Sequence, residues 1–125
     1  MRNDIRDLVK AKRIDNGELI EGFLTRMWQQ YHIIHPEDEN TAYPVAEDTI
    51  CRCVGISDIY KKAIFEYDII RHYNHSDDPD RFSIGTVYWN PEKVRYERDD
   101  MYSEEKERYT LQSDSRYEVI GHKTQ

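Results

Sequence analysis

The chain has 125 residues, of which 38% are hydrophobic, and its formal net charge at pH 7 is -7. This length allows one compact domain, or two small units that share a core, and the excess of acid disfavours nucleic acid held through phosphate neutralisation. No apolar run approaches the roughly 18 residues that a membrane-spanning helix needs, and the amino terminus lacks the apolar segment of a secretory signal. We therefore expect a cytoplasmic protein that contacts no membrane.

Aromatic residues supply much of the apolar bulk, since the chain has ten tyrosines and two tryptophans. A tyrosine buries its ring and keeps its hydroxyl in contact with water, which suits thin cores and interfaces. We expect a modest core that is extended by self-association into a homo-oligomer.

The first predicted elements are two short strands, Leu8–Arg13 and Leu19–Leu24. Asn16-Gly17 between them predicts a two-residue type I′ turn, because both residues tolerate positive φ angles. Tyr31–Ile34 is predicted as a further strand. Residues 1–45 are therefore expected to form an N-terminal β-hairpin region.

Two strands are predicted in the middle of the chain. Thr49–Val54 has a β-like pattern of apolar residues. In Ile64–Ile70, strict alternation predicts one continuous strand with Phe65, Tyr67 and Ile69 on one face.

Strands and turns alternate towards the carboxyl terminus. Residues 72–81 are polar and predict a connection, whereas Ser83–Trp89 predicts a strand. Asn90-Pro91 then turns the chain, so that Val94–Glu97 returns beside that strand.

One segment, Tyr102–Tyr109, predicts a helical turn, with Ser103 as its N-cap. Tyr117–Ile120 closes the series as a short strand. The pattern amounts to roughly eight short strands and at most one short helix. It predicts a mainly β fold in which residues 46–125 form a small antiparallel barrel or roll, as one cooperative unit with residues 1–45.

Three segments carry a family resemblance. Lys10–Leu24 combines a basic strand, an Asp-Asn-Gly-Glu turn and a Glu-Gly-aromatic step, Glu47–Ile70 ends in an Ile-Phe-Glu-x-Asp-Ile-Ile strand, and Tyr117–His122 contains Glu-Val-Ile-Gly. In this order the three segments resemble the signatures of the YopX family of phage and prophage proteins. The resemblance implies a mainly β protein whose carboxyl-terminal part is an SH3-type roll, and it implies no established activity.

Two glycines of the family pattern are replaced in this chain. Asp58-Ile59-Tyr60-Lys61-Lys62 stands where the family usually has Asp-Lys-Asn-Gly-Lys, and Tyr67 stands where a glycine usually precedes Asp68. We expect Tyr67 to turn into the core, since Phe65 and Ile69 share its predicted face.

Residue types that bind zinc occur in two His-x-x-His pairs and one Cys-x-Cys pair: His32 with His35, His72 with His75, and Cys51 with Cys53. Residues three apart on a strand project to opposite faces, so neither histidine pair converges without a bend. We predict loop-edge histidines, two buried cysteines, and no metal or other cofactor. The sequence alone leaves open whether these groups converge.

The predicted binding residues are Tyr88, Trp89 and Tyr96, as an exposed aromatic surface. Such a surface suits a second copy of the chain, or a host or phage protein. Bases could stack on it, which makes nucleic-acid binding the alternative, although the sequence shows no basic groove. An acidic chain could also mimic nucleic acid and occupy a host protein.

The sequence lacks a recognisable catalytic set, with no glycine-rich phosphate loop and no Gly-x-Ser-x-Gly. We therefore predict a non-enzymatic accessory protein of phage or prophage origin that acts through protein contacts. The enzymatic alternative is a hydrolase that pairs His72 or His75 with Asp68.

Overall fold

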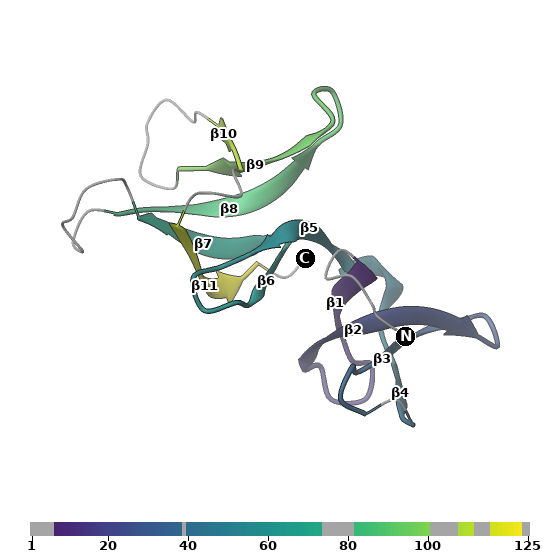
Figure 1. Cartoon of the computed structure of the whole chain (residues 1–125). Helices are drawn as coiled ribbons and strands as arrows, with labels where there is room; N and C mark the ends of the chain where they lie inside the picture. Colours follow the sequence, from purple (N-terminus) through teal and green to yellow (C-terminus); the bar gives the residue numbers. More distant parts are fainter. Residues whose placement is uncertain (1–6, 39, 74–81, 101–107, 112–115, 124–125) are drawn as a thin grey trace. The chain divides into compact units, whose positions relative to one another are not determined.

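The computed structural model describes residues 7–38, 40–73, 82–100, 108–111 and 116–123. The mainly β prediction is confirmed, because 66% of these residues lie in strands and none lies in an α-helix. The strands form two antiparallel sheets, and neither described sheet closes into a barrel (Figure 1). The packing divides the chain into a first unit, Met1–Cys53, and a second unit, Val54–Thr124, whereas we expected a division after residue 45.

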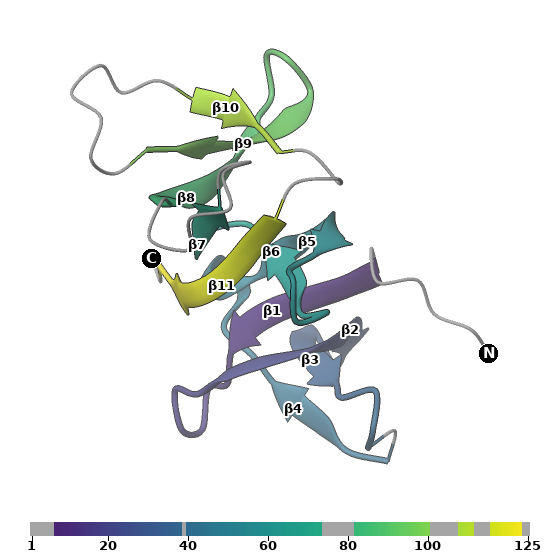
Figure 2. The same ribbon diagram turned by 60° about the vertical axis from the view of Figure 1, so that its left-hand side comes forward.

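The first unit is an antiparallel sheet with the strand order β4-β3-β2-β1-β5 (Figure 2). Its strands are β1 Leu8–Lys12, β2 Leu19–Met27, β3 Gln30–Ile34, β4 Ala42–Pro44 and the start of β5 Cys51–Ser57. One turn of 3-10 helix, Glu47–Thr49, precedes β5. Val9, Ala11, Ile33 and Val45 are buried together and form the core of this unit. The predicted strands are confirmed, with β2 three residues longer than expected and β4 not foreseen. The strand predicted from Thr49 begins at Cys51 instead, because Thr49 ends the 3-10 turn.

Gly22 lies where β2 passes very close to a neighbouring strand. A Cβ atom at this position would overlap the carbonyl oxygen of Ile34 and lie 2.7 Å from the side chain of Ile33. Gly22 is also the cross-strand partner of Val9 in the core. The Glu-Gly-aromatic step of the sequence therefore has a packing cause, since any side chain at residue 22 would push the two strands apart.

The first hairpin turn is longer than the type I′ turn predicted for Asn16-Gly17. Only Gly17 has a positive φ angle in this loop, 73°. The N–H of Gly17 donates to the carbonyl of Arg13 at 3.0 Å, and the side-chain oxygen of Asn16 accepts from the N–H of Glu18 at 2.9 Å. The hairpin is confirmed, but the turn type was wrong because Asn16 acts through its side chain rather than through a left-handed backbone.

The second unit holds a five-stranded antiparallel sheet with the order β10-β9-β8-β7-β11. The strands are β7 Asp68–Tyr73, β8 Phe82–Asn90, β9 Arg95–Asp99, β10 Arg108–Thr110 and β11 Arg116–His122. By packing, the remainder of β5 and its neighbour β6, Ala63–Phe65, also belong to the second unit, although by pairing β6 is the sixth strand of the first sheet. Ile64, Ile70, Val87 and Tyr117 are its buried core.

Ile64–Ile70 does not form the continuous strand that alternation predicted. β6 ends at Phe65 and β7 begins at Asp68, with a turn at Glu66 and Tyr67 between them. Tyr67 has a φ angle of 66°, and one carboxylate oxygen of Asp68 accepts from the N–H of Phe65 at 2.8 Å. The expectation that Tyr67 turns into the core was also wrong, since it is only half-buried at this bend.

Two other predicted boundaries change. His72 and Tyr73 were assigned to a polar connection but lie in β7, and the rest of that connection lies outside the described residues. The predicted helical turn Tyr102–Tyr109 falls mostly outside them too, and its last two residues belong to β10 instead.

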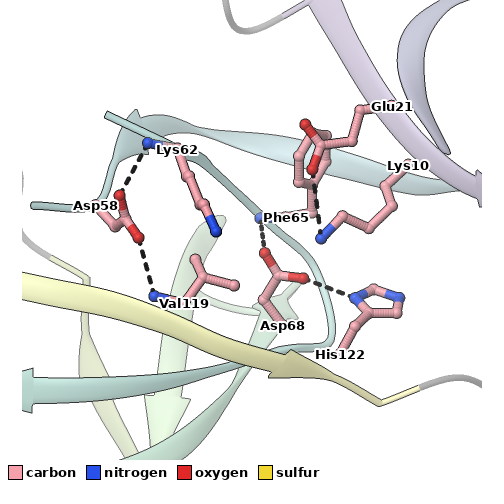
Figure 3. Close-up of polar contacts among 8 residues, drawn as sticks. All are labelled: Lys10, Glu21, Asp58, Lys62, Phe65, Asp68, Val119 and His122. Carbon is pink, nitrogen blue, oxygen red and sulfur yellow. Dashed lines mark hydrogen bonds and ion pairs between the residues drawn. The ribbon is translucent and has the colours of Figure 1, made fainter. Parts of the chain in front are cut away.

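A tight turn over residues 58–62 covers the outer edge of β11 (Figure 3). One carboxylate oxygen of Asp58 accepts from the backbone N–H groups of Tyr60 and Lys62, each at 2.8 Å. The other oxygen accepts from the N–H of Val119 at 3.1 Å, while the N–H of Ile59 donates to the carbonyl of Tyr117 at 2.8 Å. This arrangement occupies backbone groups that an edge strand would otherwise expose.

Replacing Lys61 with glycine should stabilise the second unit. Lys61 is exposed and has a φ angle of 66°, a conformation that glycine adopts freely and other residues adopt at a cost. We expect Lys61→Gly to raise the free energy of unfolding by about 0.5 to 1 kcal/mol in urea titrations. Lys62→Gly is the matched control at an exposed position without a positive φ angle, and should lower it by a similar amount. Equal effects of the two substitutions would contradict the conformational explanation.

Candidate functional site

The three predicted binding residues do not form one surface. Trp89 and Tyr96 are cross-strand partners, and their ring centroids lie 4.8 Å apart at an edge-to-face angle. Tyr96 packs against the core of the second unit, while Trp89 remains 41% exposed. Tyr88 lies on the opposite face of the sheet, beside Glu97 and with its ring 5.9 Å from that of Tyr67.

Tyr88 shares its face with a set of stacked arginine and aromatic side chains. We call this set the arginine–aromatic face: Arg71, Tyr73, Phe82, Tyr88, Arg108 and Arg116. The guanidinium of Arg71 lies 4.5 Å from the ring centroid of Phe82, that of Arg108 lies 4.8 Å from Tyr88, and that of Arg116 lies 5.9 Å from Tyr73.

Strand register places these residues on one side of the sheet. Arg116 is opposite Tyr73, and Tyr73 is opposite Phe82. The core residues Ile70, Val87 and Tyr117 each adjoin a member of the set in sequence, so they project to the other side. The arginine–aromatic face is therefore the face of the five-stranded sheet that points away from the core.

Carboxylates on this face lie deeper than the guanidinium groups. The side chain of Glu97 is 3% exposed and that of its partner Arg95 is 37% exposed, with 2.7 Å between the carboxylate oxygen and Nε. The amide of Asn90 donates to Glu97 at 2.9 Å, and this bond, followed by the Arg95 contact, lowers the pKa of Glu97 below its ordinary value. Glu97 is thus held ionised beneath its partners.

Two further carboxylates on this face, those of Glu118 and Asp99, accept hydrogen bonds from neighbouring groups of the sheet. Glu118 accepts from Arg71 at 3.1 Å and from the hydroxyl of Tyr73 at 3.0 Å. Asp99 accepts from the backbone N–H of Thr86 at 2.7 Å. These bonds direct the acids towards the sheet, whereas Arg108 and Arg116 are exposed.

The first unit presents a different feature, a tryptophan at the tip of the β2–β3 hairpin. Met27 and Gln30 are cross-strand partners, so Trp28 and Gln29 form a two-residue turn. Their φ angles are 51° and 65°, as a type I′ turn requires. Trp28 is 93% exposed. We call these two residues the Trp28 tip.

No protein-family model, no curated protein and no solved structure matches this chain. The candidate sites therefore rest on the geometry of the chain itself. No helix in the described part of the chain has the length and apolar character needed to cross a membrane.

The residue types considered for metal binding have other partners. Nδ1 of His32 donates to the carbonyl of Gln30 at 2.9 Å, and Nδ1 of His35 accepts from the N–H of Glu37 at 3.1 Å. Arg98 lies 2.9 Å from Nδ1 of His72. Within the described ranges, no group of three or more metal-ligating side chains is found, and His75 lies outside those ranges.

Cys51 and Cys53 are buried, as predicted, and neither is in a disulfide. They are 5% and 6% exposed, which is the usual environment of a cysteine that packs as a small apolar side chain.

Asp68 pairs with His122, a residue for which no role was predicted. Its carboxylate oxygen lies 2.7 Å from Nδ1 of His122 (Figure 3). His72, the described member of the predicted hydrolase pair, contacts Arg98 instead. Asp68 is fully buried and also closes the turn at Phe65. In this geometry Asp68 and His122 join β7 to the end of β11.

The Trp28 tip and the arginine–aromatic face were not predicted from the sequence. Trp28-Gln29 contains neither asparagine nor glycine, so it carries no turn signal. The arginines are scattered between residues 71 and 116 and meet only through strand pairing. Arg71 and Tyr73, which are two residues apart in β7, were the one available indication.

Proposed function

We propose that this protein is a non-enzymatic, YopX-like accessory protein of phage or prophage origin that acts through protein contacts. Its first partner in this proposal is a second copy of the chain. The observation that supports the proposal is the Trp28 tip, where an indole that is 93% exposed projects from a two-residue turn. Tryptophan is among the residues that most often dominate the binding energy of protein interfaces.

The backbone of the Trp28 tip supports a functional reason for the residues found there. Both residues have left-handed φ angles without being glycine or asparagine, which costs about 1 to 2 kcal/mol for each residue. A turn that served only to reverse the chain would be more stable as Asn-Gly. A strained backbone conformation together with an exposed apolar side chain is expected where the side chain serves in binding.

The YopX-like part of the proposal is supported by the two replaced glycines. Lys61 and Tyr67 stand at the family's glycine positions, and both have φ angles of 66°. These are conformations that favour glycine, so the backbone at both turns fits the family pattern even where the side chains differ. We extend the proposal to an SH3-type roll within residues 46–125.

The experiment compares association before and after the turn is idealised. The double substitution Trp28→Asn with Gln29→Gly should raise the free energy of unfolding of the first unit by about 1 to 2 kcal/mol, because it relieves the left-handed strain. The same change should weaken self-association by about tenfold or more in sedimentation equilibrium at high micromolar concentration. Stability and association thus change in opposite directions, so loss of association cannot result from misfolding.

A matched control exists at another turn. Val94 is 71% exposed and has a φ angle of 51°, so Val94→Asn also removes an exposed apolar side chain from a left-handed position. We expect Val94→Asn to leave self-association unchanged. A wild-type protein that stays monomeric would contradict self-association, and capture from a host lysate would then be compared between wild type and the double variant. Identical capture by the two proteins would contradict the Trp28 tip as a protein-binding site.

A further inference from the structure

The arginine–aromatic face differs in charge from the chain as a whole. The whole chain carries a formal charge of -7. On this face, however, the carboxylates of Glu97 and Glu118 are 3% and 20% exposed, whereas the guanidinium-bearing side chains of their partners are 37% and 33% exposed. In both of these ion pairs of described residues the arginine is therefore more exposed than the acid. At physiological salt the field of acids elsewhere is screened beyond about 8 Å.

From this arrangement we propose that the arginine–aromatic face binds single-stranded nucleic acid. The proposal concerns the second unit and is independent of the protein contacts proposed for the Trp28 tip. The net charge of the whole chain disfavours nucleic acid, but on this face ion pairing directs the carboxylates of Glu97 and Glu118 inwards.

Guanidinium groups stacked on aromatic rings can bind both parts of a nucleotide. The plane of a guanidinium that covers a ring has a second side on which a base can stack, and its edge N–H groups point outwards towards phosphate. Arg71 shows the edge-on use of a stacked guanidinium, since it lies over the ring of Phe82 while one of its edge nitrogens binds the carboxylate of Glu118 at 3.1 Å. Exposed ring surface adds to the platform, because Phe82 is 40% exposed.

The dimensions of the face suit an extended strand. Phe82 begins β8 and Tyr88 lies six residues further along it, about 20 Å away at roughly 3.3 Å per residue. A sheet of this length that combines aromatic rings with cations is typical of surfaces that bind a few unpaired nucleotides.

Other polyanions fit the face less well. A duplex keeps its bases stacked on one another, so it would leave the aromatic rings of this face without a partner. An acidic peptide would satisfy the guanidinium groups but would leave the aromatic rings without a partner. Single-stranded nucleic acid uses the charges and the rings together.

The test measures binding of the full chain to a fluorescein-labelled oligothymidylate of about 12 nucleotides by fluorescence polarisation. Binding should be detected at low salt and should weaken on addition of salt, with a logarithmic slope of about -2 to -3 if three or four phosphates are neutralised. Arg108→Ala and Arg116→Ala should each weaken binding by about threefold to tenfold, and Tyr88→Ala should also weaken it. Both arginines are exposed, so these variants are expected to fold.

Arg26→Ala is the matched control. Arg26 is exposed in the first unit and also lies over a ring, 5.3 Å from the centroid of Tyr31, so its removal changes the net charge by the same amount. This variant should bind the oligothymidylate as the wild type does. The proposal is overturned if no binding occurs at low salt, if Arg26→Ala weakens binding as much as Arg108→Ala, or if polyglutamate competes as well as unlabelled oligothymidylate.

Discussion

Replacing Gly85 with alanine should lower the free energy of unfolding of the second unit by about 3 kcal/mol or more. A Cβ atom at residue 85 would overlap the carbonyl oxygen of Asp99 and lie 2.8 Å from its carbonyl carbon. Backbone atoms cannot move aside as a flexible side chain can, so β8 and β9 would have to separate. The same movement would break the 2.7 Å bond between Asp99 and the N–H of Thr86.

Urea unfolding followed by fluorescence measures this effect. Trp28 is already 93% exposed in the folded chain, so a change in emission on unfolding reports mainly on Trp89 in the second unit. Gly121→Ala is the matched control, because a Cβ atom there would lie 3.6 Å from Ile69, an ordinary contact. It should change stability by less than about 1 kcal/mol. If Gly85→Ala were equally mild, the close approach of β8 and β9 would be wrong.

Replacing Asp58 with alanine should lower the free energy of unfolding by about 3 kcal/mol, because the buried carboxylate of Asp58 accepts three backbone N–H groups. Asp58→Asn retains one acceptor oxygen but presents an amide to the N–H of Val119. We therefore expect Asp58→Asn to lower the free energy of unfolding by about half as much as Asp58→Ala. Hydrogen exchange should accelerate at Val119 in both variants, and at Tyr60 and Lys62 mainly in the alanine variant.

Glu92→Ala controls for the loss of one negative charge. Glu92 is exposed in the turn between β8 and β9 of the same unit, and this substitution should change stability by no more than about 0.5 kcal/mol. If Asp58→Ala lowered stability no more than Glu92→Ala does, the 58–62 turn would not depend on the carboxylate of Asp58.

The local pattern of apolar residues predicted most strands of this protein. It failed at turns that contain no glycine, asparagine or proline. In Ile64–Ile70, alternation continues through a bend at Tyr67, because Asp68 closes the bend with its side chain and the tyrosine accepts a left-handed φ angle. Neither effect alters the hydrophobic period. Trp28-Gln29 escaped prediction for the same reason, since its conformation is imposed by the pairing of Met27 with Gln30.

The candidate surfaces were harder to predict than the strands. Tyr88 and Trp89 are adjacent in sequence and were assigned to one surface, but adjacent strand residues project to opposite faces. The partners of Tyr88 come from residues 67 and 108, which strand pairing brings together across a long stretch of sequence. The sequence alone could not show whether the acid or the arginine of an ion pair is more exposed. The difference depends on which of the two side chains lies beneath the other.

The turn at residues 58–62 also limits how copies of this chain can assemble. Sheets with bare edges can grow without end, one chain after another, and such growth leads to fibres. Here the backbone of Tyr117 and Val119 is already engaged by Ile59 and Asp58. Loss of that turn would therefore threaten solubility as well as stability, and the Asp58→Ala variant is the one in which we expect precipitation on prolonged storage.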